Sequence, residues 1–305
     1  MPRHPAAFVG LVLLILAIAY VGWTVHVAGT NPDGMGTLIH GWKPILALVV
    51  GVAGLVLTYR FWMRSAWFIT LKELRTYFTS PVPYAVGMAV FGINGFIYWL
   101  ILTQWIESGQ AQDVGMTLMT LTFLLLLISP LVTMRLFAEE KRTGTYEMLM
   151  TRPLHDVHVV VGKFVGAVCV FGAILAGTLV LPIIVELGAD PGPDWGPVWS
   201  AYVGLFGWCM AFTAIGLFCS ALTSSQIAAA ALAWFLLLVL WLLSILREVA
   251  PGKLISKVGD YLSPRGTMMD FCQGTINTTH CVYLLSVTVF FLFGAWMALY
   301  ASRSK

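Results

Sequence analysis

Charged residues are scarce in this chain. Only 10% of its 305 residues are Asp, Glu, Lys or Arg, whereas soluble domains carry about 25%. Hydrophobic residues make up 59%, and the mean hydropathy is +0.87. This composition excludes an ordinary soluble domain. It predicts an all-α polytopic membrane protein, because helices satisfy their own backbone hydrogen bonds in lipid.

Sequence motifs of catalysis and metal binding are also missing. The chain has no G-x-x-x-x-G-K-[ST] sequence, since Gly162-Lys163-Phe164 lacks both the upstream glycine and the hydroxyl. It has no H-E-x-x-H and no G-x-S-x-G either. His155 and His158 lie three apart, but no cluster of Cys or carboxylates converges on them. We therefore expect no catalytic residue, no metal site, no cofactor on this chain and no nucleic-acid partner.

The five cysteines form no C-x-x-C pair. Three of them, Cys169, Cys209 and Cys219, fall in apolar stretches and are expected to be small buried hydrophobic residues. Cys272 and Cys281 are expected on the outer side of the membrane. Their spacing is compatible with a disulfide between them and also with two free thiols.

Eight apolar stretches approach or exceed the ~20 residues that a helix needs to cross the hydrocarbon core. They are Phe8–Ala28, Pro44–Trp62, Pro83–Trp105, Met116–Ala138, Val157–Leu187, Val198–Leu222, Gln226–Leu246 and Cys281–Ala301. The first is predicted to be a retained span rather than a cleaved signal peptide, because it is long and lacks a good cleavage site. The fifth is too long for one simple span, so it extends into the cytoplasm before Gly162 or bends at Pro182.

The distribution of Lys and Arg predicts the orientation. With both termini in the cytoplasm, 12 of the 17 basic residues fall on the inner side and 5 on the outer side. The Asn31–Trp42 connector and the acidic, Pro/Gly-rich Gly188–Pro197 segment then face outward. Within the spans, Arg135 and Lys163 lie near inner ends, where long side chains are expected to reach water. Asn94 and Gln104 are expected to form hydrogen bonds between helices.

Residues Ser65–Ser80 have the pattern of an amphipathic helix. Trp67, Leu71, Leu74 and Phe78 recur on one face, and Lys72, Glu73, Arg75 and Thr76 occupy the other. Such a helix is expected to lie in the membrane interface. It is either a simple surface anchor or an elbow helix that leads into a transport core and contacts a motor subunit.

The segment Glu139–Pro153 is a charged loop between two apolar stretches. Gly144 and Pro153 bracket a short predicted helix, Thr145–Thr151, and Asp156 is a candidate N-cap of the helix that follows. Such a loop is either a solvated connector or a docking segment for a soluble partner. In the second case, one apolar face would enter a groove of that partner. This face consists of Tyr146, Leu149 and Met150.

The longest outer segment is Arg247–His280. Its mixture of apolar residues with proline and glycine predicts two short helices at the outer interface, or an ordinary surface loop.

Three blocks of this sequence together resemble the membrane-spanning subunits of ABC-type-2 transporters, and most of all the gliding-motility (Gld-type) permeases. The first is Lys72–Tyr84, KELRTYFTSPVPY, similar to the family's entry to its first core span. The second is Phe137–Lys163, similar to its charged loop followed by Gly-Lys. The third runs from Tyr261-Leu262-Ser263-Pro264 to Tyr283. The likeness covers residues 70–303.

This resemblance implies a six-span exporter core, here preceded by two extra transmembrane helices. The corresponding domains are residues 1–64 and residues 65–305. It implies that a soluble ABC ATPase subunit binds ATP and Mg²⁺, and that two permease subunits face each other as a homo- or heterodimer in the inner membrane. Its elbow helix would contain Lys72, Glu73, Arg75 and Tyr77, and its ATPase-coupling residues would be Glu139, Glu140, Lys141, Arg142, Gly144, Thr145, Tyr146, Glu147, Leu149 and Met150.

Three functions are compatible with these features. The first is a permease subunit that couples ATP hydrolysis on a partner to the movement of an unknown substrate. The second is transmission of force or conformation to an extracytoplasmic partner without cargo, for which the outer segment would be the docking surface. The third is an integral-membrane lipid-modifying enzyme, which the missing catalytic motifs disfavour. The two extra helices are expected to contact an accessory subunit.

Overall fold

The computed structural model describes residues 64–108, 114–145, 156–188, 193–242 and 264–303. The first two predicted spans and the connector between them lie outside these residues, as do most of the outer segment and the predicted coupling residues Tyr146, Glu147, Leu149 and Met150. Residues Thr70–Lys305 form one compact unit, separate from residues Met1–Ile69.

The described residues form helices and no strands, which confirms the all-α fold class. The helices are α4 (Arg64–Thr79), α5 (Pro81–Ser108), α6 (Val114–Thr133), α7 (Arg135–Arg142), α9 (Asp156–Thr178), α10 (Val180–Gly188), α11 (Trp195–Leu222), α12 (Gln226–Leu242), α15 (Pro264–Cys272) and α16 (Thr278–Arg303).

Among the described residues, five helical stretches are long and apolar enough to cross a membrane. They are Pro81–Thr103, Thr117–Arg142, Asp156–Leu187, Trp195–Leu222 and Thr278–Ser302. The helix α12 is apolar but shorter in its described part. These stretches coincide with spans expected from the sequence, so the chain is a multi-pass membrane protein. The total of about eight spans stays a prediction.

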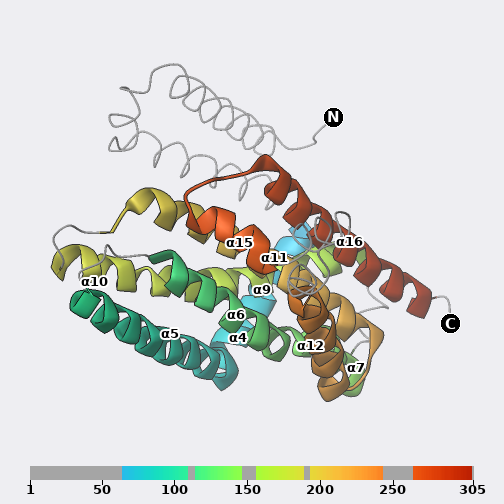
Figure 1. Ribbon diagram of the computed structural model, residues 1–305. Helices are drawn as coiled ribbons and strands as arrows, with labels where there is room; N and C mark the ends of the chain where they lie inside the picture. The colour runs from blue at the N-terminus through green and yellow to red at the C-terminus, as the bar shows by residue number, and fades with distance from the viewer. Residues whose placement is uncertain (1–63, 109–113, 146–155, 189–192, 243–263, 304–305) are drawn as a thin grey trace, which may run out of the picture. The chain divides into compact units, whose positions relative to one another are not determined.

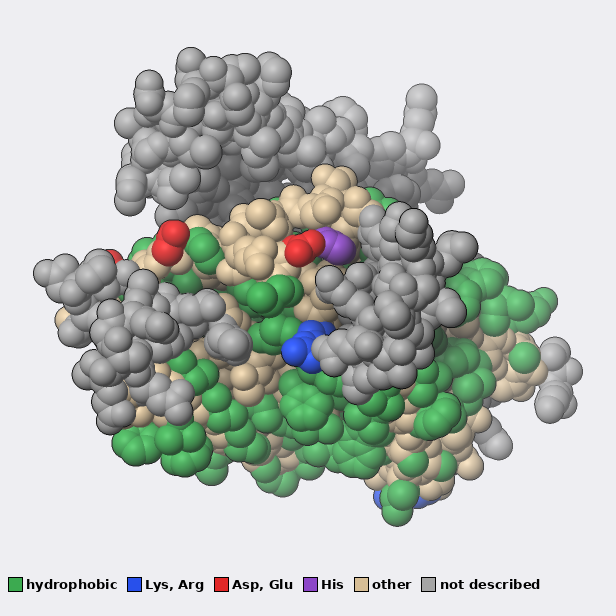
Figure 2. Space-filling view, in the orientation of Figure 1, with side chains coloured by type: hydrophobic (Ala, Val, Ile, Leu, Met, Phe, Trp, Pro, Cys, Tyr) green, Lys and Arg blue, Asp and Glu red, His purple; other side chains and the backbone are tan. Residues whose placement is uncertain are grey.

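The centre of the bundle is α11. It packs against α6, α7, α9, α12, α15 and α16, and Figure 1 shows it among these helices. Large apolar side chains of α5 and α16, such as Met88, Trp99 and Phe290, are exposed instead. Figure 2 accordingly shows a surface dominated by hydrophobic side chains, with few charged ones. Exposed apolar helices of this kind suit contact with lipid tails.

Two prolines remove backbone hydrogen bonds from helices of the bundle. A proline has no N–H, so the carbonyl four residues earlier loses its helical partner. Because of Pro182, the carbonyl of Thr178 has no helical N–H partner, and the helix is interrupted at Leu179, between α9 and α10. The expected bend at Pro182, one of the two explanations for this long stretch, agrees with the interruption. Pro130 frees the carbonyl of Leu126 in the same way, and the Ser129 hydroxyl donates to that carbonyl at 3.3 Å. In Figure 1, α10 and α7 lie at opposite ends of the bundle.

Candidate functional site

A buried cluster of three charged side chains joins α4, α7 and α9. The Nζ atom of Lys163 lies 2.8 Å from Oε1 of Glu73 and 2.9 Å from Oε1 of Glu140. Only 2% of the Lys163 side chain is exposed, and its ammonium lies 5.2 Å from the centre of the Phe137 ring. We call Glu73, Glu140 and Lys163 the charged junction. Burial of these charges is tolerated because each has an opposite charge within hydrogen-bonding distance.

A glycine on α9 allows α4 to approach closely enough for Glu73 to reach Lys163. A Cβ atom at Gly166 would lie 2.9 Å from Cβ of Glu73, so any larger residue there would push α4 away. One turn earlier, the Thr70 hydroxyl donates to the carbonyl of Gly162 at 3.0 Å. Gly166 therefore allows the close approach of α4, and Lys163, three residues earlier on α9, supplies the charge between the helices.

The junction corrects two expectations from the sequence. Lys163 does not extend to water, because its ammonium is held between two carboxylates inside the protein. Glu73 is likewise buried and is not part of a solvated face. On α4, the face packed into the protein contains Thr70, Glu73 and Tyr77, whereas Leu71 and Phe78 of the predicted apolar face are exposed. That exposure agrees with an apolar face directed at lipid.

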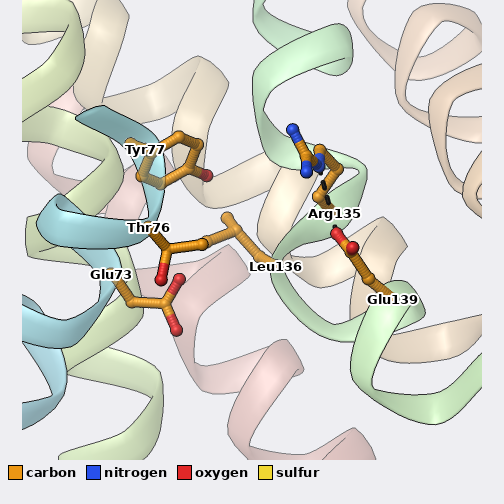
Figure 3. Close-up of a pocket in the computed structure, with 6 residues that line it drawn as sticks. All are labelled: Glu73, Thr76, Tyr77, Arg135, Leu136 and Glu139. Carbon is orange, nitrogen blue, oxygen red and sulfur yellow. Dashed lines mark hydrogen bonds and ion pairs between the residues drawn. The ribbon is translucent and has the colours of Figure 1, made fainter. Parts of the chain in front are cut away.

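Further polar contacts surround the junction on the side of α4 and α7. Arg135 donates to Glu139 at 3.0 Å and to the Ser80 hydroxyl at 2.9 Å. The exposed Lys72 lies 3.7 Å from Glu140. A cavity of about 40 Å³ lies between the two helices, and Figure 3 shows the side chains that line it. Its lining residues are Glu73, Thr76 and Tyr77 of α4 and Arg135, Leu136 and Glu139 of α7.

Tyr77 connects α4 to the end of α6. Its hydroxyl donates to the carbonyl of Val132 at 3.0 Å. Burial, and then the nearby carboxylate of Glu73, raise the pKa of this phenol well above its ordinary value of 10. Tyr77 therefore stays protonated and remains a hydrogen-bond donor at any physiological pH.

The helix α7 is attached to the C-terminal end of α11 by hydrogen bonds of Ser220 and Lys141. The Ser220 hydroxyl accepts from the N–H groups of Phe137 and Ala138, each at 3.0 Å, and donates to the carbonyl of Met134 at 2.9 Å. Lys141 donates to the carbonyl of Ala221. The Ser220 bonds supply partners at the start of α7, where the helical ladder is interrupted, and the Lys141 bond holds the other end of α7 to α11.

Comparison with known families gives a match over nearly the whole chain. The family model described as "ABC-2 family transporter protein" matches residues 7–302. The chain belongs to the ABC-2 transporter family. No curated protein matches it. Members of this family are membrane subunits of transporters, and the five candidate spans agree with that.

In this ABC-2 protein, the charged segment Glu139–Pro153 begins within α7, and the chain turns at Gly144, just after this helix. Gly144 has a φ of +72°, a conformation that L-residues with side chains rarely adopt. The N–H groups of Thr143 and Gly144 bond back to the carbonyls of Glu139 and Lys141, at 2.9 and 3.4 Å. The chain therefore turns at the predicted position. Of the other candidate coupling residues in the described part, Arg142 and Thr145 are exposed, whereas Glu139, Glu140 and Lys141 are partly or largely buried.

The segment Arg247–His280 of the ABC-2 protein contributes the helix α15, one face of which is buried. Phe271 of this helix packs against Gly204 of α11, where a Cβ atom would lie 2.7 Å from the ring. Asp270 lies 2.7 Å from Nε2 of His280 at the start of α16. Cys272 and Cys281 are free thiols, as are the other three cysteines, so no disulfide forms between them. Cys169 is exposed rather than buried.

In the described part of the chain, no group of three His, Cys, Asp or Glu residues has a metal-binding arrangement. The contact that sequence reasoning missed is the one between Lys163 and the two glutamates. The Gly-Lys sequence belongs to the second family-like block. The two glutamates that pair with Lys163, however, lie 90 and 23 residues away from it along the chain. One sequence feature does point to this contact. A lysine lies a few residues inside a predicted span, and such a buried charge needs a carboxylate partner from another segment.

Proposed function

We propose that this ABC-2 protein is the permease subunit of an ABC exporter whose ATPase is a separate soluble chain. The chain acts as a dimer, with an identical or related second permease, in the inner membrane with both termini in the cytoplasm. Within the family it is most like the Gld-type permeases. ATP and Mg²⁺ are bound by the ATPase, so this chain is not itself an enzyme.

The observation that supports this function is the attachment of α7. The predicted docking segment 139–153 continues directly from α7, which bonds to α4 and α9 through the charged junction and to α11 through Ser220. A displacement of this segment by an ATPase would therefore act on three helices at once. Because packed helices move as rigid bodies, this arrangement suits coupling of ATP-driven closure to rocking of the spans.

The docking role is best tested at residues that do not take part in the charged junction. Reversal of Glu140 would disrupt the contact with Lys163, so a loss of binding in that variant would have two explanations. Arg142 is exposed, and Leu149 belongs to the predicted apolar face. Arg142→Glu and Leu149→Asp are therefore the informative changes.

We expect both variants to insert normally and to lose the co-purifying ATPase. Removal of an anchor from an interface typically costs about 2 kcal/mol or more, which lowers affinity more than tenfold. Arg265→Glu, a charge reversal at an exposed site of α15, is the matched control and should retain the ATPase. Wild-type binding and turnover in the Leu149→Asp protein would refute the docking role. The same assay tests the orientation, since a cytoplasmic ATPase cannot reach a loop on the outer face.

A further inference from the structure

A cluster of neutral polar side chains is buried deep within the described spans. It consists of Asn94 and Tyr98 on α5, Thr178 on α9 and Tyr202 on α11. Thr178 and Tyr202 share a hydrogen bond of 3.0 Å. Phe91 of α5, one turn before Asn94, packs against α9 at Gly177, the residue before Thr178, so the members on α5 and α9 lie at the same level. We call these four residues the neutral cluster.

Two members of this cluster lack hydrogen-bond partners among the described residues. They are Oδ1 of Asn94 and the hydroxyl of Tyr98, whose side chains lie one helical turn apart on α5. Asn94 is 2% exposed and Tyr98 is 6% exposed. Lipid tails cannot hydrogen-bond to them, and an unpaired polar group costs free energy in such surroundings. Most buried polar groups in proteins are paired, so these two need an explanation.

The cluster adjoins the interruption between α9 and α10. Thr178 is the last residue of α9, and Pro182 cannot donate to its carbonyl. The helices α5 and α9 approach closely at this level, because a Cβ atom at Gly177 would lie 2.3 Å from the Phe91 ring. Asn94 is the fourteenth residue of the 28-residue α5, near the middle of that helix. Interrupted helices near the middle of the membrane are typical places for substrate binding in transporters.

The chemistry of the cluster restricts its ligand. Residues 81–106, 164–185 and 195–222 contain no Asp, Glu, Lys or Arg, so these parts of α5, α9–α10 and α11 offer no counter-ion. The amide oxygen of Asn94 requires a donor, and the Tyr98 hydroxyl both donates and accepts. A ligand hydroxyl satisfies both groups, whereas an anionic or purely accepting group does not.

We propose that the neutral cluster is an intramembrane binding site for the hydroxyl group of an uncharged, lipid-like substrate. This inference rests on the proposed transport function and specifies the class of its substrate. Asn94 accepts from the substrate hydroxyl, Tyr98 donates to it, and the aromatic rings of Phe91 and Tyr202 lie against its apolar part.

Photo-crosslinking of the intact protein in phosphatidylcholine nanodiscs tests this site directly. The probe is a diacylglycerol with a diazirine in one acyl chain. Its 3-O-methyl ether lacks the donor, and the matching phosphatidic acid replaces the hydroxyl with an anion. We expect the diacylglycerol to label peptides of α5, α9 or α11 at least about fivefold more than either analogue, since the analogues lose or mismatch a hydrogen bond. Equal labelling by all three probes would overturn the proposal.

Variants then separate binding from a role in helix packing. Asn94→Leu and Tyr98→Phe should each lower labelling by the diacylglycerol about five- to tenfold. Thr103→Val is the matched control on α5, because its hydroxyl already donates to the carbonyl of Leu100 at 2.8 Å, and it should label like the wild type. Unchanged labelling in both test variants would show that water or packing accounts for the cluster and would refute the site. No ATPase is present in this assay, so its result is independent of the docking experiment.

Discussion

The charged junction and the neutral cluster are both buried and polar, but the junction consists of paired charges and the cluster of neutral groups. In the junction, each charge has an opposite charge within 3 Å. In the cluster, two of the four residues have polar atoms without a partner in the described chain. Charges cannot be buried unpaired, so the junction is expected to be a permanent structural contact. An unpaired neutral group costs less free energy than an unpaired charge, so the cluster is suited to a contact that forms and breaks.

The largest effect is expected from Lys163→Met. This change leaves Glu73 and Glu140 buried without their counter-ion, and breaking a buried ion pair costs about 3–5 kcal/mol. Chemical unfolding of the detergent-solubilised protein, followed by tryptophan fluorescence, measures the loss. Lys72→Met is the control, because Lys72 is 65% exposed and such pairs contribute less than about 1 kcal/mol. If the two variants are equally stable, the charged junction is not the stabilising contact inferred here.

A smaller effect is expected from Tyr77→Phe, which removes the hydrogen bond to Val132 at a cost of about 1 kcal/mol in unfolding free energy. The cost should depend on pH. Because the folded pKa of Tyr77 is raised by burial and by Glu73, the wild-type protein holds this proton more tightly when folded than when unfolded. Its advantage over the variant is therefore complete below the unfolded pKa of about 10 and falls as the pH rises above it.

Unfolding titrations at pH 8 and pH 11 would measure this trend. Tyr84→Phe serves as the comparison, since Tyr84 also donates to a backbone carbonyl, that of Phe78 at 2.9 Å, but is exposed. A stability difference between wild type and Tyr77→Phe that grows at high pH would contradict the assigned burial of the phenol.

The smallest effect on stability is expected from Asn94→Leu. The asparagine carries an unpaired oxygen, and its replacement by an apolar residue of similar size removes a desolvation penalty. We expect a change within about 1 kcal/mol, in either direction, in the same unfolding assay. A loss above about 2 kcal/mol would mean that Asn94 forms a structural hydrogen bond, and the contrast with the charged junction would then disappear.

Much of the fold follows from local sequence patterns. The long apolar stretches predicted the described spans, and Pro182 predicted the interruption between α9 and α10 within three residues. Gly144 was expected to turn the chain, and its φ is positive. These features depend on residues close together in the chain, which is why periodicity and turn chemistry reveal them. The partners of Lys163 and Ser220 were not predictable in this way, because they come from helices far apart in sequence.

The sequence by itself determined that this protein is a multi-pass helical membrane protein with an amphipathic helix and a charged loop, because hydropathy and charge along a chain decide which segments lipid accepts. Only the tertiary structure decided which polar groups meet. It buried Glu73 on a helix whose apolar residues Leu71 and Phe78 stay outside, and it placed Lys163 between two carboxylates. The physical reason is that a buried charge is stable only beside an opposite charge, and the packing of α4, α7 and α9 determines where that opposite charge lies.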